Sequence, residues 1–296
     1  MLHSALESCH PIRLEIHLLH PEDLPKQTLQ RLQALVEGGG GVFHPSAIGE
    51  EAVRNLPDTW YFPKIIWYRS FLPQLRPELD RILYLDCDTL IVDTLQPLWE
   101  TDLEKFRVAA VLNLIVPELA TRHHSLGIPP GQPYFNSGML LMNLDRMRRE
   151  HCIEQLFDHA ARYAGQSVWP DQDSLNYVLG PECLFVHPRW NCQNSFFYWP
   201  QATEAFGEAV LAEATRSPAI LHFEGPPETK PWHYLNDHPY RERYWRHLRA
   251  IPWPTPSPSG RTLKNILRRY LPAAGQAGLS RLSRRVRRVV RAARRL

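Results

Sequence analysis

The chain has 296 residues, 44% of them hydrophobic, which is enough for one large α/β domain with an appendage. No apolar run approaches the roughly 20 residues that span a bilayer, so we expect any membrane contact to be peripheral. The five scattered cysteines contain no Cys-x-x-Cys pair, which argues against a disulfide framework and a cysteine zinc site. Reduced thiols and an N-terminus without signal-peptide character predict a cytoplasmic protein.

The net charge of +3 is the sum of two parts of the chain that carry opposite net charges. Residues 261–296 hold 12 of the 34 basic residues and no acidic one, which leaves 22 basic residues against 31 acidic ones elsewhere. We therefore expect a mildly acidic globule, residues 1–250, and a strongly basic tail, residues 261–296. Residues 251–260 contain a proline at every second position near their centre and predict a stiff linker between the two.

The N-terminal part alternates between strand and helix signals. Residues 12–19 alternate apolar and polar side chains, which predicts a strand, and residues 21–36 carry leucines at helical spacing. The pattern of residues 64–75 predicts an aromatic-rich helix with Arg69 near its middle. Arg69 is either a surface arginine or, because it precedes the acidic segment described next, a contact for a diphosphate.

Two carboxylates follow a short apolar run. Ile82–Leu85 is typical of a buried strand, and Asp86 and Asp88 come where that strand ends. If the chain turns just after Asp86, both carboxylates can converge on one magnesium or manganese ion and leave positions for phosphate oxygens. The alternative is a pair of aspartates that form a turn or cap a helix.

Further strands are predicted at residues 107–113 and 139–142, separated by a proline-rich loop long enough to be a functional lid. Gly138 precedes the second strand and would allow a backbone to approach a ligand closely. Residues 145–164 predict an amphipathic helix with Asp145 as its N-cap. Together these elements predict an α/β fold.

A second polar concentration is Asp171-Gln172-Asp173. It is either a group of functional side chains or an N-cap with further acid in the first helical turn. Residues 184–186 and 219–222 predict two more short strands, the second ending at His222. A lone histidine at a strand end is more often structural than a metal ligand.

The basic tail carries an apolar stripe. Leu279, Leu282, Val286 and Val289 recur at helical spacing, and arginines fill the other face. This pattern predicts an amphipathic helix on an anionic membrane surface. Nucleic-acid binding and a disordered tail are the alternatives.

Four motifs in chain order resemble those of the family-8 retaining glycosyltransferases, and most closely the bacterial lipooligosaccharide galactosyl- and glucosyltransferases. The likeness covers the chain from about Leu6 to Trp232 and extends to the basic tail. The motifs are Tyr84-Leu-Asp86-Cys-Asp88 with Pro97-Leu-Trp99, then Phe135-Asn136-Ser-Gly138, then Asp171-Gln172-Asp173, and last His222-x-x-Gly225 with Lys230-Pro-Trp232.

The resemblance implies a Rossmann-like nucleotide-sugar-binding fold of the GT-A type, with a mixed and mainly parallel sheet. It also implies roles for particular residues. Asp86, Asp88 and His222 would bind the metal; Arg69, Asn136, Gly138, Gly225 and Lys230 would contact the donor; Asp171, Gln172 and Asp173 would surround the reacting sugar; and Asn113 would face the acceptor.

The implied reaction transfers glucose or galactose from a UDP-sugar to a glycan or glycolipid acceptor with retention, with Mn²⁺ or Mg²⁺ as cofactor, in lipopolysaccharide or lipooligosaccharide biosynthesis. The enzyme would lie at the inner face of the cytoplasmic membrane, and no nucleic acid is expected as a partner. Family members open with a strand and an Asp-Asp-x-Tyr-like segment that holds the uridine. When this chain is matched to the family on the four motifs, Met1 falls after that element. We therefore expect the first strand to be missing.

Two other functions fit parts of the pattern. Ile82 to Thr89 also matches the nucleophile motif of haloacid-dehalogenase-like phosphohydrolases, in which the first aspartate attacks phosphorus. The later Gly-Asp-x-x-x-Asp motif of those enzymes is absent from the sequence. A non-catalytic or truncated relative that binds sugar nucleotides is the second alternative, and turnover of the donor would distinguish it from the enzyme.

Overall fold

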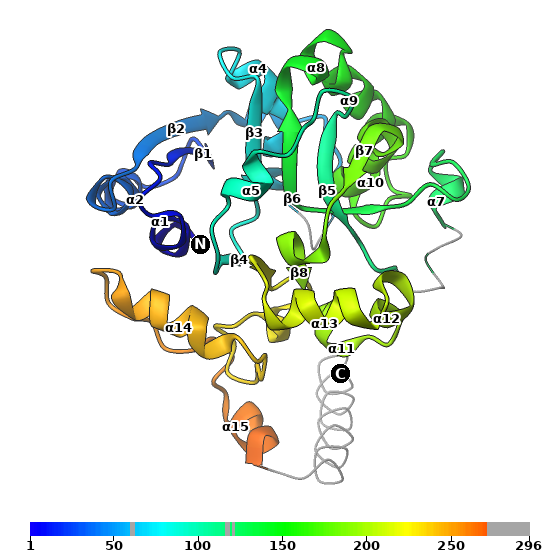
Figure 1. Cartoon of the computed structure of the whole chain (residues 1–296). Coiled ribbons are helices and arrows are strands. Elements are labelled where there is room, and N and C mark those ends of the chain that lie inside the picture. The colour runs from blue at the N-terminus through cyan, green and yellow to red at the C-terminus, as the bar shows by residue number, and fades with distance from the viewer. Residues whose placement is uncertain (60–62, 116–118, 120–121, 271–296) are drawn as a thin grey trace, which may run out of the picture. The chain divides into compact units, whose positions relative to one another are not determined.

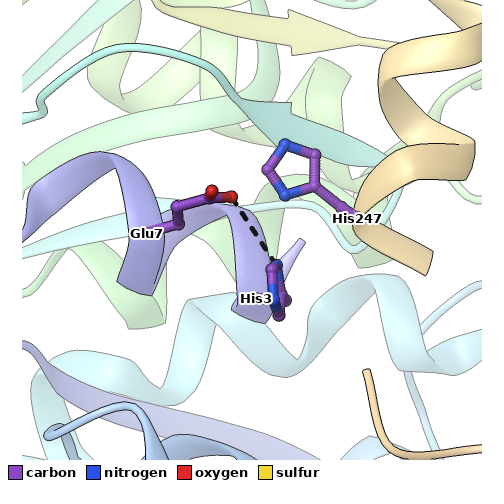
Figure 2. Close-up of side chains that lie close together, drawn as sticks. All are labelled: His3, Glu7 and His247. Carbon is purple, nitrogen blue, oxygen red and sulfur yellow. Dashed lines mark ion pairs between the residues drawn. The ribbon is translucent and has the colours of Figure 1, made fainter. Parts of the chain in front are cut away.

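A computed structural model describes residues 1–59, 63–115, 119 and 122–270 of the chain (Figure 1). The chain forms two compact units, residues 1–223 and residues 224–296. The first unit is an α/β structure with three small sheets, and it begins with helix α1 (Leu2–Cys9). In α1, His3 Nδ1 lies 3.9 Å from the Glu7 carboxylate one helical turn further on, as Figure 2 shows.

The first sheet pairs β1 (Glu15–Pro21) with β2 (Val42–Ile48) in parallel. Helix α2 (Lys26–Gly38) connects the two strands, as parallel strands require a crossover. The alternating pattern at the start of the chain and the leucine spacing after it thus predict both elements. The observed strand begins three residues later than the prediction and the helix five residues later.

The central sheet has four strands in the order β3-β6-β5-β7. β6 runs antiparallel to both of its neighbours, and β5 and β7 are parallel. The sheet is therefore mixed, as predicted, but two of its three pairings are antiparallel, so it is not mainly parallel. The strands are β3 (Arg81–Leu85), β5 (Val108–Leu112), β6 (Phe135–Asn143) and β7 (Cys183–Phe185).

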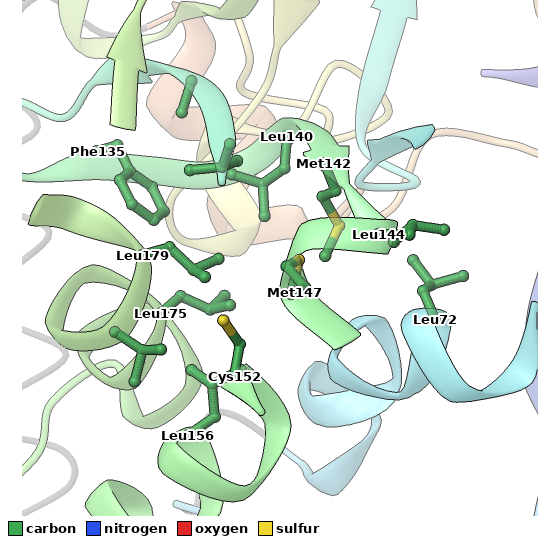
Figure 3. Close-up of a cluster of buried hydrophobic side chains, with 13 residues drawn as sticks. Leu72, Phe135, Leu140, Met142, Leu144, Met147, Cys152, Leu156, Leu175 and Leu179 are labelled. Carbon is green, nitrogen blue, oxygen red and sulfur yellow. The ribbon is translucent and has the colours of Figure 1, made fainter. Parts of the chain in front are cut away.

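The hydrophobic core covers one face of the central sheet (Figure 3). Leu140 and Met142 of β6 pack against Leu156, Leu175 and Leu179 from the helices that follow, and all five side chains are fully buried. β6 is buried along almost its whole length, whereas β3 is only half-buried. The predicted burial of β3 on both faces is therefore wrong, because β3 is an edge strand of this sheet.

The predicted helix 145–164 is two helices, α8 (Leu144–Arg149) and α9 (Cys152–Arg162). They are separated at His151, whose φ of 53° lies in the left-handed region and interrupts the helical hydrogen bonds. The N-cap of α8 is Asn143 rather than Asp145, because the Asn143 side chain accepts a hydrogen bond from the Arg146 N–H at 3.0 Å.

The predicted helix 64–75 is also divided. It consists of the 3₁₀ helix η1 (Lys64–Phe71) and the short helix α4 (Leu72–Leu75). Pro73 in the first turn of α4 has no N–H to donate to an earlier carbonyl, so a continuous α-helix is not formed across this point.

The third sheet has the order β4-β9-β8, with β4 (Thr89–Ile91) antiparallel and β8 (Cys192–Gln193) parallel to β9 (Ile220–His222). α10 (Pro170–Leu179) and the 3₁₀ helix η3 (Pro188–Asn191) pack near the end of β6. The remaining described helices of this unit are α3 (Glu50–Val53), α5 (Gln96–Trp99), α7 (Arg122–Ser125), η2 (Gly180–Glu182), α11 (Ser195–Tyr198), α12 (Gln201–Phe206) and α13 (Glu208–Arg216).

The second unit contains η4 (Pro227–Thr229), α14 (Arg241–Ala250) and α15 (Leu263–Tyr270). The predicted linker, residues 251–260, turns back on its own unit, where Ser259 accepts from the Tyr234 N–H and donates its N–H to Trp232, both at 2.8 Å. Across the described ranges, no helix combines the length and the apolar character needed to cross a membrane. The predicted tail helix at 279–296 lies outside the described residues.

Candidate active site

Three predicted metal ligands converge in the first unit. Asp86 follows the last residue of β3, Asp88 lies in the turn before β4, and His222 ends β9. His222 Nε2 lies 3.3 Å from Asp88 Oδ1 and 3.9 Å from Asp86 Oδ2. One ligand atom from each residue lies within 4.8 Å of the other two. The two strand ends therefore bring together side chains that are more than 130 positions apart in sequence.

Backbone hydrogen bonds fix the turn that carries the aspartates. The Asp86 N–H donates to Gly138 of β6 at 2.9 Å, and the Asp86 carbonyl accepts from the N–H and the hydroxyl of Thr89. The Asp88 carbonyl accepts from the Phe223 N–H at 3.0 Å, next to His222. Cys87, between the two aspartates, is exposed. The backbone of each aspartate is thus held by a neighbouring segment, and the chain turns after Asp86 as the sequence predicts.

A chain of three asparagine amides leads to His222. Asn136 Nδ2 donates to Asn113 Oδ1 at 3.0 Å, Asn191 Nδ2 donates to Asn136 Oδ1 at 2.9 Å, and Asn191 Oδ1 lies 3.0 Å from His222 Nδ1. The Gly138 N–H also donates to Asn136 Oδ1 at 3.0 Å. Because a backbone N–H is always a donor, this bond sets the direction of the whole chain.

That direction determines which nitrogen of His222 carries its proton. With Asn136 Oδ1 as the acceptor, Asn191 must present its NH₂ group to Asn136 and its oxygen to His222. Nδ1 of His222 is then an N–H donor, and Nε2 is the ring nitrogen that faces Asp86 and Asp88 and can bind a cation when it is unprotonated. Histidines that bind metals use this same arrangement, with the second ring nitrogen fixed by a hydrogen bond. No sequence pattern identifies Asn191 as a functional residue, since it lies at the start of an aromatic segment.

Gly138 has a steric role in this arrangement. A Cβ atom at this position would lie 2.1 Å from Cε1 of the His222 ring, so only glycine leaves room for the imidazole. The predicted close approach to Gly138 thus involves a side chain of this protein. The predicted contact of Gly138 and Asn136 with a donor stays a prediction.

Arg69 is buried rather than exposed on the surface. Its Nη2 lies 3.2 Å from Asp86 and 3.3 Å from Asp171, and its guanidinium stacks 4.3 Å from the centre of the Tyr84 ring. Its Nη1 also donates to the Ser137 carbonyl. Arg69 therefore links the end of β3 to the start of α10. Its contact with a diphosphate stays a prediction.

The Asp171-Gln172-Asp173 motif lies in the first turn of α10, and all three side chains are buried. Burial raises the pKa of Asp171 to about 6, although the guanidinium of Arg69 opposes this shift. Gln172 Oε1 accepts from the N–H and the hydroxyl of Ser137 at 2.9 and 3.2 Å. These contacts place Asp171 and Gln172 next to the Phe-Asn-Ser-Gly strand.

Asp173 is fully enclosed, and both of its oxygens accept hydrogen bonds. Oδ1 accepts from the Tyr134 hydroxyl at 2.7 Å, and Oδ2 accepts from the Ser167 hydroxyl and from the Trp169 N–H. Asp173 lies inside the first turn of α10 and bonds back to the N–H of Trp169, the N-cap residue, as the later residue of a capping box does. Asn176, one turn later, bonds both the N–H and the carbonyl of Phe135 and docks α10 on β6.

Gly225 and Lys230 belong to the second unit, so the structure does not place them relative to Asp86. Gly225 has a φ of +92°, a conformation that favours glycine. The Thr229 hydroxyl donates to the carbonyl of Glu224 or Pro226, both at 2.7 Å, which holds the loop before Lys230 together. The donor contacts of Gly225 and Lys230 stay predictions.

The donor set fits a divalent cation. Two carboxylates and one imidazole offer the oxygen and nitrogen ligands that suit manganese, and carboxylates alone suit magnesium. The amide chain that fixes His222 and the paired strands that hold the aspartates are the supports that such a site needs. The arrangement is therefore a candidate metal site at the end of a strand in an α/β fold, where nucleotide-type ligands bind.

The comparison with protein families agrees with this geometry. Residues 1–236 match the model of glycosyl transferase family 8, and the chain belongs to this family. The phosphohydrolase alternative is therefore wrong. The chain is 30% identical to General stress protein A of Bacillus subtilis over 203 residues, which are 66% of this chain and 68% of that protein.

Other relatives act on lipopolysaccharide according to their names. Lipopolysaccharide glucosyltransferase WaaO of Escherichia coli is 29% identical over 70% of this chain and 60% of its own length. Lipopolysaccharide 1,3-galactosyltransferase of Salmonella typhimurium is 26% identical over 76% of this chain and 66% of its own length. The crystal structure of the galactosyltransferase LgtC with donor and acceptor sugar analogues superposes with a TM-score of 0.73 at 25% identity, over 86% of this chain and 92% of that one.

Proposed function

We propose that this protein is a metal-dependent retaining glycosyltransferase that moves glucose or galactose from a UDP-sugar to a glycan or glycolipid acceptor in lipopolysaccharide biosynthesis. The observation that carries the proposal is the convergence of Asp86, Asp88 and His222. The family and the names of the relatives support the reaction class and the acceptor class. Either hexose agrees with these names, and Mn²⁺ or Mg²⁺ agrees with the ligands.

The chemistry follows from charge. Cleavage of the sugar–phosphate bond leaves an anionic UDP, and a bound cation supplies Lewis-acid neutralisation of that charge. Asp86, Asp88 and His222 would hold the cation, and Lys230 would add a fixed positive charge near the diphosphate. Arg69 lies between Asp86 and Asp171 and keeps the two carboxylates at a defined separation. These residues bind and orient the donor before any bond breaks.

Retention requires either a covalent sugar intermediate or attack from the face of the leaving group. The burial and full hydrogen bonding of Asp173 argue against its use as a nucleophile, and Gln172 is a weak one. We favour attack on the same face, with a leaving-phosphate oxygen accepting the proton of the acceptor hydroxyl. Asp171, Asn136 and Gly138 would surround the donor sugar.

A cavity beside Asn113 supports an acceptor site at this position. A cavity of about 240 Å³ is lined by Asn113, His123, Gln132 and Tyr134, among others. The rings of His123 and Tyr134 stack with their centres 4.3 Å apart. Because sugars bind through flat aromatic surfaces combined with polar side chains, this cavity suits part of a glycan.

We also propose that the enzyme works at the inner face of the cytoplasmic membrane, where the basic tail would bind anionic lipid. α15, at the start of the tail, exposes Leu263 and Leu267 one helical turn apart, and Lys264, Arg268 and Arg269 are interspersed with them. This is the pattern of a helix that lies on a membrane surface.

The test is the release of UDP from UDP-glucose and UDP-galactose with increasing Mn²⁺ or Mg²⁺. Asp86→Asn and Asp88→Asn should abolish turnover, whereas Asp93→Asn, an exposed carboxylate in the same segment, should not. Full turnover in both site variants would contradict the proposal. Donor binding by the wild type without turnover, with all acceptor glycans tried, would favour the non-catalytic relative.

A further inference from the structure

A second group of metal-binding side chains lies on the two-stranded sheet. His17 of β1 and His44 of β2 are directly opposite each other in the parallel register. Glu15 precedes His17 by two residues and therefore points to the same face of the strand. Neither strand carries Asp86, Asp88 or His222, so this group belongs to a different part of the first unit.

The three side chains are close enough to share one ion. The rings of His17 and His44 stack with their centres 4.7 Å apart and their planes 16° apart. The Glu15 carboxylate lies 3.8 Å from His44 Nε2. One nitrogen or oxygen from each residue lies within 4.8 Å of the others. Because ring nitrogens bind zinc at about 2 Å, a shared ion requires the stacked rings to turn toward each other.

His17 shows that the group is incomplete without a ligand. Its Nδ1 is buried, and among the described residues it has no hydrogen-bond partner. A buried nitrogen without a partner is unfavourable and calls for an explanation, such as an ion. Burial, and next the positive charge of Arg76, lower the pKa of His17.

The surroundings allow a cation despite Arg76. One end of the Arg76 guanidinium donates to the Ser46 hydroxyl at 2.6 Å, and the other lies 4.0 Å from Glu78. Glu15 and Glu78 thus supply two negative charges against one positive charge near the histidines.

We propose that Glu15, His17 and His44 form a binding site for a zinc-like divalent cation. Two imidazoles and one carboxylate are a ligand set typical of zinc, with water completing the coordination. A bound ion would join β1 to β2 across their register and stabilise a sheet that has only two strands. The site does not depend on the proposed transferase function.

The experiment uses the full-length protein, stripped of metal and titrated with Zn²⁺ against a chromogenic chelator at pH 7. Zn²⁺ also binds aspartate–histidine groups, so His222→Ala is the background in which the second site is counted. In this background we expect one zinc equivalent, and His44→Ala or His17→Ala should weaken its binding by at least about tenfold. His187→Ala is the matched control, since it is also a half-buried histidine near a glutamate, 3.8 Å from Glu213.

Glu15→Gln removes one ligand at an exposed position and therefore tests the site without disturbing the core. Like the two histidine substitutions, it should weaken zinc binding. X-ray absorption of the zinc-loaded His222→Ala protein should show two imidazole ligands. Equal zinc affinity in the His17 and His44 variants and the control, or an absorption spectrum without paired imidazoles, would overturn the proposal.

Discussion

Asn191 Oδ1 accepts a hydrogen bond from His222 Nδ1 at 3.0 Å, and this contact fixes the tautomer of a predicted metal ligand. The direction of the bond is set by the Gly138 N–H through Asn136. Metal affinity in this protein should therefore depend on an asparagine that does not touch the ion.

Asn191→Leu should weaken Mn²⁺ binding by about 10–100-fold, the usual effect of removing a partner of a ligating histidine. Asn191→Asp keeps an oxygen acceptor toward His222 and should retain most of the affinity. Titration calorimetry with Mn²⁺ measures both effects. Carbon-13 chemical shifts of the His222 ring, measured at a pH at which the ring is neutral, should show more of the Nε2-protonated tautomer in Asn191→Leu than in Asn191→Asp, and the same tautomer ratio in both variants would contradict the role of Asn191.

Gly138→Ala should displace the His222 ring, because the added methyl carbon would lie 2.1 Å from Cε1. We expect a loss of about 1–3 kcal/mol in the free energy of unfolding from the forced overlap, together with weaker Mn²⁺ binding. Thermal unfolding and metal titration provide the two measurements. Gly38→Ala is the control, since its Cβ would meet nothing within 4 Å. An unchanged metal affinity in Gly138→Ala would show that the ring position does not matter.

Acidification should destabilise the protein through His238. Burial lowers its pKa from the ordinary 6.5 to about 4, with Asp237 opposing, and its Nδ1 accepts from the Tyr240 N–H at 3.1 Å. The unfolded chain binds this proton more readily, so the stabilising contribution is complete above pH 6.5 and is lost as the pH falls toward 4. The loss amounts to at most about 3 kcal/mol.

His238→Asn keeps an oxygen near the position of Nδ1 and cannot titrate, so its free energy of unfolding should change less between pH 6.5 and 4 than that of the wild type. Denaturant unfolding over this range measures the difference. His124→Asn, at an exposed position, is the control. Parallel pH profiles for His238→Asn and the wild type would contradict the prediction.

The basic tail should direct the protein to anionic membranes. Residues 271–296 contain eight arginines, each worth up to about 1 kcal/mol near anionic lipid and weakened by salt. Full-length protein should float with anionic liposomes at low salt, and a chain ending at Pro258, which lacks α15 and the arginines after it, should float less. Equal flotation of both, or binding indifferent to lipid charge, would leave nucleic-acid contact or disorder as the role of the tail.

Much of this architecture could be predicted from the sequence. Apolar runs located β5 and β6, and the motif order indicated the family that the comparison confirms. The approach of His222 to Asp86 is implied only by the family resemblance, because local patterns carry no information on contacts across more than 130 residues. The predictions are least accurate where tertiary contacts determine how deeply a strand is buried, as in the half-buried edge strand β3.

Helix boundaries were also poorly predicted, for local reasons. Periodicity continues across His151, but its left-handed backbone divides α8 from α9. The direction of the amide chain through Asn191 could not be predicted at all, because it depends on one backbone N–H in a distant strand. The membrane tail, the division into domains and the individual site roles stay predictions.

The exposed thiol of Cys87 between the two aspartates has a practical consequence. All five cysteines are free, and Cys9, Cys152 and Cys192 are buried while Cys183 is half-buried. Desolvation and the two neighbouring carboxylates raise the pKa of the Cys87 thiol, so the reaction needs an alkaline pH. There a bulky alkylating reagent should react at the Asp86–Asp88 turn before it reaches the other thiols. A molecule that binds over the turn should slow this alkylation. The alkylation rate would therefore report binding without a sugar acceptor and without product formation.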